Sequence, residues 1–266
     1  MRVTILGCGP SGGVPLIGND WGECDPANPR NRRRRASILV EHGGAQILVD
    51  ASPDMRMQLL DAGISRLDAI LFTHAHADHC HGIDEVRALN RAMGEAVPIY
   101  GAPETLAELK RRFAYIFRPS DPAAGAVFYK PSLVPTLIEG AFEVAGVRVV
   151  PFTQNHGFST TLGFRFGGLA YSTDAVALDE PAFAALEGVE TWIVDCYRRT
   201  PHPTHTHLAQ TLDWIARVQP KRAILTHMDV QLDYETLRRE LPAGVEPGYD
   251  GMVIEASALL ESRRGA

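Results

Sequence analysis

The chain reads Thr73-His74-Ala75-His76-Ala77-Asp78-His79 directly after an apolar run, 67–72, that is typical of a buried strand. This loop holds three imidazoles and one carboxylate, which are ligands that zinc, manganese and iron accept. Alternate residues of an extended segment point the same way, so His74 and His76 can bind one ion while Asp78 and His79 turn toward a second. Single histidines are common in surface loops, but this clustering indicates a metal site.

Three more candidate ligands occur later in the chain, each at the end of an apolar run. They are His156, Asp174 and His227. Taken singly, each is more typical of a hydrogen-bonded loop residue. Together with the histidine-rich loop they are predicted to be ligands, because residues at the C-terminal ends of strands can converge along one edge of a sheet.

The order of these residues resembles a known series of motifs. Asp50, the histidine-rich loop, His156, Asp174 and His227 follow one another as the five motifs of the metallo-β-lactamase superfamily do. The resemblance extends over nearly the whole chain, and the combined motifs are highly specific.

Within the superfamily, three stretches are similar to the phosphodiesterase branch. They are the glycine-rich stretch 6–15, the arginine-rich stretch 31–37 and the stretch 79–84. That branch holds the cyclic-phosphate phosphodiesterases of phosphonate catabolism, which this chain resembles most, and the tRNA 3′-processing nucleases as more distant relatives.

The pattern of elements favours an α/β fold. Short links join the early strands into hairpins, whereas the later strands alternate with helices, which suits two mixed sheets with helices outside. The resemblance implies the same arrangement, a four-layer αββα sandwich, and we expect a single domain over residues 1–266. Strands are predicted near 2–7, 37–41, 45–50, 67–72, 98–100, 142–152, 161–166, 169–172, 191–195, 222–226 and 252–256. Helices are predicted near 53–62 (with Ser52 as N-cap), 84–93, 103–116, 181–186, 207–218 and 233–240.

Composition narrows the class of protein. The chain has 266 residues, of which 45% are hydrophobic, enough for a sizeable core. No apolar stretch approaches the roughly 18–20 residues that span a membrane. The 4 cysteines are scattered and no signal peptide is recognised, so a cytoplasmic location is expected. The net charge of −6 argues against bulk nucleic-acid binding but leaves room for a local basic patch.

On this resemblance we assign the ligands to two divalent transition-metal ions. The first is expected to be bound by His74, His76 and His156, the second by Asp78, His79 and His227, with Asp174 bridging both through its two oxygens. Zinc and manganese fit this set, and iron is compatible with it. Two such ions can hold a bridging hydroxide at neutral pH. Asp78 is expected to help orient that hydroxide, and Asp50 to hold a metal-binding histidine in position.

Two histidines, His202 and His205, precede the predicted helix at 207–218, and a third, His207, begins it. A helix N-terminus favours anions, and the phosphodiesterase branch has a histidine at the start of this helix. His207 is therefore predicted to be catalytic, binding a phosphate oxygen or protonating the leaving alkoxide. His205 is predicted to contribute to substrate binding, although a solvent-facing position is the simpler interpretation of both His202 and His205.

The arginine-rich stretch suits a phosphate substrate, because guanidinium groups pair with phosphate oxygens. Most of its members are expected to face solvent. The residues predicted to contact the substrate are Arg34, Arg35 and Ser37, and those predicted to support the ligands from behind are His81 and Asp84. For the last two, ordinary polarity at a helix start is the alternative.

These observations favour a dinuclear metal-dependent phosphodiesterase for a small cyclic phosphate or nucleotide-like phosphodiester. One alternative is a tRNA 3′-processing endonuclease, but the segment 110–140 is short and apolar for an arm that holds tRNA. A thioester or lactone hydrolase is a second alternative, and a metal-bearing binding protein without turnover is a third. We expect a small-molecule substrate, no membrane and no stable nucleic-acid partner, and a homodimer is compatible with the sequence.

Overall fold

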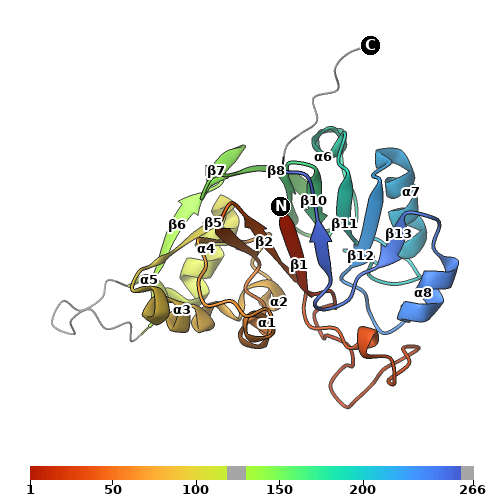
Figure 1. The fold of residues 1–266 in the computed structure, drawn as a ribbon, viewed down its shortest axis with the longest axis horizontal. Helices are drawn as coiled ribbons and strands as arrows, with labels where there is room; N and C mark the ends of the chain where they lie inside the picture. Colours follow the sequence, from red (N-terminus) through yellow and green to blue (C-terminus); the bar gives the residue numbers. More distant parts are fainter. Residues whose placement is uncertain (119–129, 259–266) are drawn as a thin grey trace, which may run out of the picture.

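Two seven-stranded sheets form the centre of the molecule, with helices on both outer sides (Figure 1). The computed structural model describes residues 1–118 and 130–258. The first sheet has the order β14-β1-β2-β3-β4-β5-β6 and the second has the order β13-β12-β11-β10-β9-β8-β7. Both sheets contain parallel and antiparallel pairs. This confirms the predicted four-layer α/β sandwich of two mixed sheets.

The elements follow one another along the chain as strands with intervening helices. The first half contains β1 (Arg2–Gly7), β2 (Ser37–His42), β3 (Ala45–Val49), α1 (Met55–Asp61), β4 (Ala69–Leu71), α2 (Ala77–Cys80), α3 (Val86–Met93), β5 (Val97–Gly101), α4 (Pro103–Arg112), α5 (Ala114–Phe117) and β6 (Leu133–Leu137). The second half contains β7 (Phe142–Val144), β8 (Val147–Asn155), β9 (Thr160–Phe166), β10 (Leu169–Ser172), α6 (Glu180–Leu186), β11 (Thr191–Asp195), α7 (Leu208–Val218), β12 (Arg222–Thr226), α8 (Tyr234–Glu240), β13 (Val245–Pro247) and β14 (Val253–Glu255).

Apolar side chains cover both faces of the central strands. In β2, Ile38 and Val40 pack in a core that contains residues of both sheets, whereas Leu39 packs in a second core with α1, α3 and α4. Successive side chains of a strand point to opposite faces, so a strand covered on both sides must be apolar throughout. The continuous apolar runs of the sequence are the result.

Two strands at the sheet edges were not predicted from the sequence. β6 contains Pro135 and β13 contains Pro247. Proline cannot donate a hydrogen bond to a sheet, which argues against a strand in the sequence, but an edge strand tolerates it. Each of these strands lies at the end of its sheet.

Three predicted boundaries were wrong for local reasons. The strand near 142–152 is a hairpin of β7 and β8, because Ala145 and Gly146 both have positive φ and turn the chain. The helix near 103–116 is interrupted at Phe113. The first helix starts at Met55 rather than 53, and Ser52 Oγ instead accepts a hydrogen bond from the Asp54 amide at 3.1 Å. In the described part of the chain, no helix combines the length and apolar character needed to cross a bilayer.

Candidate metal centre

The seven predicted ligands lie together at one edge of the two sheets. They are carried by the segments that follow β4, β8, β10 and β12. Six of them are buried, and His76 is exposed. Their donor atoms form two groups, in each of which all atoms lie within 4.8 Å of one another. The groups are His74, His76, His156 and Asp174, and Asp78, His79, Asp174 and His227.

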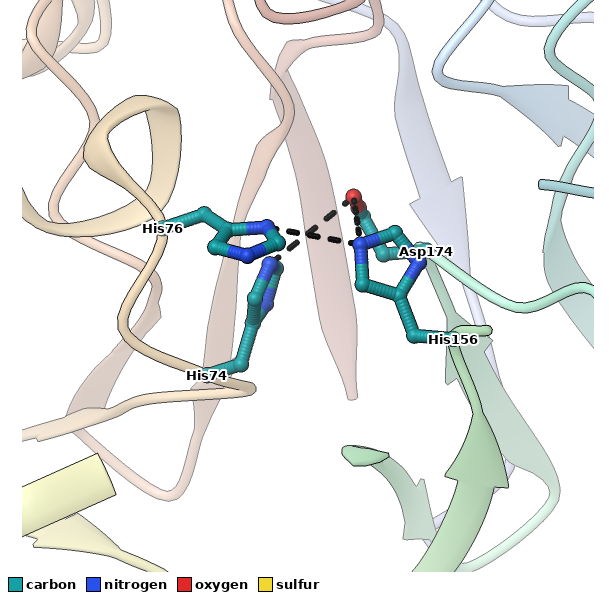
Figure 2. Close-up of side chains that lie close together, drawn as sticks. All are labelled: His74, His76, His156 and Asp174. Carbon is teal, nitrogen blue, oxygen red and sulfur yellow. Dashed lines mark hydrogen bonds and ion pairs between the residues drawn. The ribbon is translucent and has the colours of Figure 1, made fainter. Parts of the chain in front are cut away.

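The first group joins the histidine-rich loop to the second sheet (Figure 2). His74 and His76 come from the loop after β4, and His156 and Asp174 face them from the ends of β8 and β10. His156 Nε2 lies 3.3 Å from His76 Nδ1 and 3.8 Å from Asp174 Oδ2. His74 Nε2 lies 3.9 Å from the same Asp174 oxygen.

The second group surrounds the other oxygen of Asp174. His79 Nε2 and His227 Nε2 lie 3.1 Å and 3.5 Å from Asp174 Oδ1. The same two nitrogens lie 3.3 Å and 3.6 Å from Asp78 Oδ2. Asp174 is thus the only residue common to these two groups, and it turns one oxygen toward each. This is the arrangement expected of a bridging carboxylate.

The donor set fits divalent transition-metal ions. The Nε2 atoms of His74, His79 and His227 are buried and have no hydrogen-bond partner, which is costly unless another acceptor of their lone pairs is present. Imidazole nitrogens and carboxylate oxygens are the ligands of zinc, manganese and iron. Each ion would be held by four side chains, with Asp174 counted in both groups.

The charges of the centre change the protonation of its histidines. Burial lowers the pKa of His74 well below its ordinary value. For His227 burial acts in the same direction, but Asp174 and Asp78 outweigh it and raise the pKa to about 9. Burial also opposes protonation of His79, yet the surrounding carboxylates, Asp174 foremost, raise its pKa. Since a metal ligand must be deprotonated, ion binding at this centre would release protons.

Hydrogen bonds behind the ligands fix their orientation. Asp50, at the end of β3, lies 2.7 Å from His79 Nδ1 and accepts hydrogen bonds from the amide and hydroxyl of Thr73. Asp50 is thus placed to hold a candidate ligand, His79, in position. His156 Nδ1 lies 2.7 Å from the Thr204 carbonyl oxygen, which directs Nε2 toward the cluster.

Three residues of the centre have left-handed backbone conformations. Asp50, Asp174 and His227 have φ of 65°, 55° and 59°. Such conformations cost about 1–3 kcal/mol each in residues other than glycine and cluster at functional sites. Here they turn the chain sharply at the end of a strand and direct each side chain into the cluster.

Asp195, a fully buried carboxylate at the end of β11, was not predicted from the sequence. Asp195 Oδ2 lies 3.3 Å from His205 Nδ1, and Asp195 Oδ1 lies 3.8 Å from His227 Nδ1. Asp195 follows an apolar run, as Asp174 does, and this signal could have identified it. Unlike Asp174, it was not part of a recognised motif. Asp195, His205 and His227 form a third group of close donor atoms that overlaps the second.

The structure brings His205, rather than His207, to the centre. His205 Nε2 lies 3.8 Å from Asp174 Oδ2, and its ring stacks on that of His227 at 4.8 Å. His207 is the N-cap of α7, is only partly buried and makes no side-chain capping bond. The ring of His202 lies tilted against that of His205, at a ring distance of 5.2 Å.

A cavity of about 400 Å³ opens onto the ligands. Small-molecule pockets have volumes of roughly 300–1,000 Å³, so this one suits a small substrate. His205 lines it and His207 does not. The full lining is Ser11, His76, Asp78, His156, Phe158, Ser159, Asp174, Thr204, His205 and His227.

The predicted arginine contacts with substrate receive no support from the geometry. Arg34 pairs with Asp61 at 2.7 Å and lines a different cavity. Arg35 pairs with Asp54 at 3.3 Å. Ser37 is fully buried, where its hydroxyl donates to the carbonyl oxygens of Val49 and Asp50. None of the three lines the cavity beside the ligands.

His81 and Asp84 also lie apart from the ligands. The His81 ring packs edge-on against Phe113, and Asp84 accepts a hydrogen bond from the Tyr115 hydroxyl. Both residues are exposed. The alternative of ordinary polarity at a helix start fits them better than a supporting role.

Comparison with known proteins agrees with this centre. The sequence profile of the Beta-lactamase superfamily domain matches residues 45–228, which include all seven ligand candidates. The chain belongs to the metallo-β-lactamase superfamily. The predicted family is confirmed.

One solved structure is similar over its whole length. It is described as a new diphosphatase from the PhnP family, is 35% identical, covers 98% of this chain and 99% of its own, and has a TM-score of 0.89. This similarity supports the predicted phosphodiesterase branch of the superfamily.

Two curated relatives are longer than this chain. An octanoyltransferase of Porphyromonas gingivalis (strain ATCC BAA-308 / W83) is 31% identical over 95% of this chain and 51% of its own length. A ribonuclease Z of Bradyrhizobium sp. (strain ORS 278) is 30% identical over 52% of this chain and 46% of its own. The chain thus spans about half the length of the curated relatives it matches.

Proposed function

We propose that this chain is a metal-dependent phosphodiesterase that hydrolyses a small phosphodiester such as a cyclic ribose phosphate or a nucleotide. The proposal rests on the position of Asp174, whose two oxygens face two separate groups of candidate ligands beside a small cavity. Similarity to the PhnP-family structure supports a phosphate substrate. We further propose that the protein forms a single domain and binds two divalent ions, zinc or manganese in preference to iron.

The ligand set would hold the two ions, with Asp174 shared between them. Ions bound there would supply Lewis-acid polarisation of a phosphoryl oxygen and a lowered pKa for water. The reaction adds water to phosphorus and breaks the bond to the leaving oxygen. Asp78, which lines the cavity, is placed to orient the attacking water.

His205 is the candidate general acid. Its Nε2 faces the cavity near Asp174, and its Nδ1 faces the buried carboxylate of Asp195. Asp195 can orient the ring, so that Nε2 is placed to give a proton to the leaving oxygen. His207 lies outside the cavity lining, so we assign the predicted catalytic role to His205 instead.

A comparison of model substrates tests the proposal. With zinc or manganese present, bis-p-nitrophenyl phosphate should be hydrolysed faster than p-nitrophenyl phosphate and p-nitrophenyl acetate. The Asp174→Ala variant should lose this activity. A preference for the monoester or the acetate would reject the phosphodiesterase assignment.

Acyl chemistry is the second candidate, because the octanoyltransferase relative matches along nearly the whole of this chain. That relative is about twice as long, so about half of the protein with that named activity has no counterpart in this chain. Turnover of an octanoyl thioester above that of the phosphodiester would favour this candidate. The ribonuclease Z relative makes a tRNA precursor the third substrate to include. Part of the segment 110–140 considered for a tRNA arm lies outside the described residues.

A further inference from the structure

Phe158 is an exposed aromatic side chain at the rim of the metal-centre cavity. It is 94% exposed and lines the same cavity as His156 and Asp174. Among the exposed large hydrophobic side chains of the described residues, it alone lines this cavity. A phenylalanine left in water at the mouth of a site forfeits the free energy that burial of its ring would give.

The turn that carries Phe158 is held firmly. The His156 amide donates to the Ser159 carbonyl oxygen at 2.9 Å, and the Gly157 amide donates to Asn155 Oδ1 at 2.7 Å. Gly157 has a φ of 75° and packs closely on Pro203, in the loop that leads to His205. The backbone of Phe158 is therefore fixed relative to both a metal ligand and the candidate acid.

The rest of the cavity lining is polar. It consists of serine, threonine, histidine and aspartate side chains, and Phe158 is its only apolar member. A long acyl chain would need apolar walls on several sides. A planar ring needs one aromatic face and can leave its other face in water.

We propose that Phe158 determines substrate specificity by stacking on a planar ring of the substrate, in the first place a nucleobase. This inference rests on the proposed phosphodiesterase function and narrows its substrate class to nucleotides. The phosphodiester would occupy the cavity beside Asp174, with the base against Phe158 and the ribose between them.

Paired substrates test this role. The kinetics of adenosine cyclic phosphate and of the base-free ribose cyclic phosphate are to be measured for the native protein, Phe158→Ala and Phe158→Trp. We expect Phe158→Ala to raise KM for the adenosine compound about 10- to 100-fold, the range that loss of one stacked base gives, and to leave the base-free compound nearly unchanged. Phe158→Trp should retain low KM. Leu60→Ala, which removes a 59% exposed side chain from α1, is the matched control and should leave KM for both compounds unchanged.

The outcomes separate the inference from the function on which it rests. If neither cyclic phosphate is hydrolysed by the metal-loaded native protein, the proposed function fails. If both are hydrolysed and Phe158→Ala affects them equally, the protein is a phosphodiesterase and the stacking role is wrong. A rise in KM confined to an octanoyl thioester would show that Phe158 contacts an acyl chain and would also overturn the inference.

Discussion

Single carboxylates organise this centre at the scale of the residue. Asp174 faces both ligand groups, Asp50 holds His79, and Asp195 lies behind His205. All three are fully or almost fully buried at the end of a strand, where an unpaired charge is costly. Each therefore depends on its histidine partners, and the histidines in turn depend on the carboxylates for their orientation.

Asp174→Ala should lose more metal than any single histidine substitution, because it removes a ligand from both groups. We expect near-complete loss of both ions, whereas His76→Ala should affect one. Elemental analysis of protein purified without chelator measures this. Asp84→Asn, an exposed carboxylate beside Tyr115, serves as control and should keep its metal. Equal metal content in Asp174→Ala and His76→Ala would contradict the shared role.

His205→Ala should reduce kcat roughly 10²–10⁴-fold while metal content is kept, since a positioned acid or base contributes this much. The reduction should be smaller for p-nitrophenolate leaving groups, which need little protonation. His207→Ala, two residues along the same loop, should have little effect in the same assay. The assignment of the acid to His205 fails if the larger loss follows the His207 substitution.

Asp250 should make stability depend on pH. Burial raises its pKa to about 7, and it accepts hydrogen bonds from the amides of Cys8 and Arg34. The folded state then binds a proton between about pH 4 and 7 that the unfolded state has lost, so stability falls as pH rises through this window. Because the side chain keeps some solvent contact, we expect the free energy of unfolding to fall by about 1–2 kcal/mol across this window.

The urea midpoint of Asp250→Asn, measured against the native protein from pH 5 to pH 8, tests this dependence. As pH rises, the urea midpoint of the variant should increase relative to that of the native protein. This change should level off above about pH 7. Two parallel curves would show that Asp250 keeps the same charge in both states.

At the scale of the element, the candidate ligands lie in the connecting segments that follow the strands. The strands determine where each of these segments begins. β8, β10, β11 and β12 all run in one direction, so their C-terminal ends reach the same edge of the second sheet. The short turn between β8 and β9 is the tightest of these connections. It holds His156 on one side and packs on the loop of His205 on the other.

Gly157→Ala should disturb this turn. A Cβ atom would meet the Pro203 carbonyl oxygen at 2.7 Å and Thr204 Cγ2 at 2.8 Å, in addition to the strain of its positive φ. We expect kcat/KM to fall on the order of 10²-fold, as a misplacement of about 1 Å can cause. Gly43→Ala is the control, because it has a φ of 59° but open space around it. Similar activity in the two variants would show that the contact with the 203–204 backbone is unimportant.

At the scale of the whole molecule, the metal centre joins the two sheets. Four ligand candidates follow β4 of the first sheet, and three follow strands of the second. Ions bound there would act as cross-links in the folded state that the unfolded chain does not form. The stability of the protein should therefore include a contribution from metal binding.

Chelation should lower the thermal midpoint. At a metal concentration about 1,000 times Kd, binding adds about 4 kcal/mol to the free energy of unfolding. For a domain of this size that raises the thermal midpoint by roughly 8–16 °C. Differential scanning calorimetry before and after chelator, and after zinc or manganese is restored, measures the change. In Asp174→Ala the chelator should have little effect. An unchanged midpoint in the native protein would contradict a cross-linking role.

The sequence by itself determined the layers of the fold and the choice of ligand candidates. Seven ligand candidates could be identified because each follows an apolar run directly, so strand and ligand are neighbours in the chain. The two-sided burial of the central strands likewise produces a pattern that is visible in the sequence. β6 and β13 could not be found in this way, since each is a short edge strand that is incompletely buried and contains a proline, Pro135 or Pro247.

Only the tertiary structure decided which neighbouring polar side chains reach the centre. His205 and His207 are two residues apart, and the choice between them depends on the packing of their loop against Asp195 and Tyr197. The arginines at 34 and 35 suit phosphate by chemistry, yet Asp61 and Asp54 pair with them on other parts of the fold. Such partners are distant in the chain, and only folding brings them together.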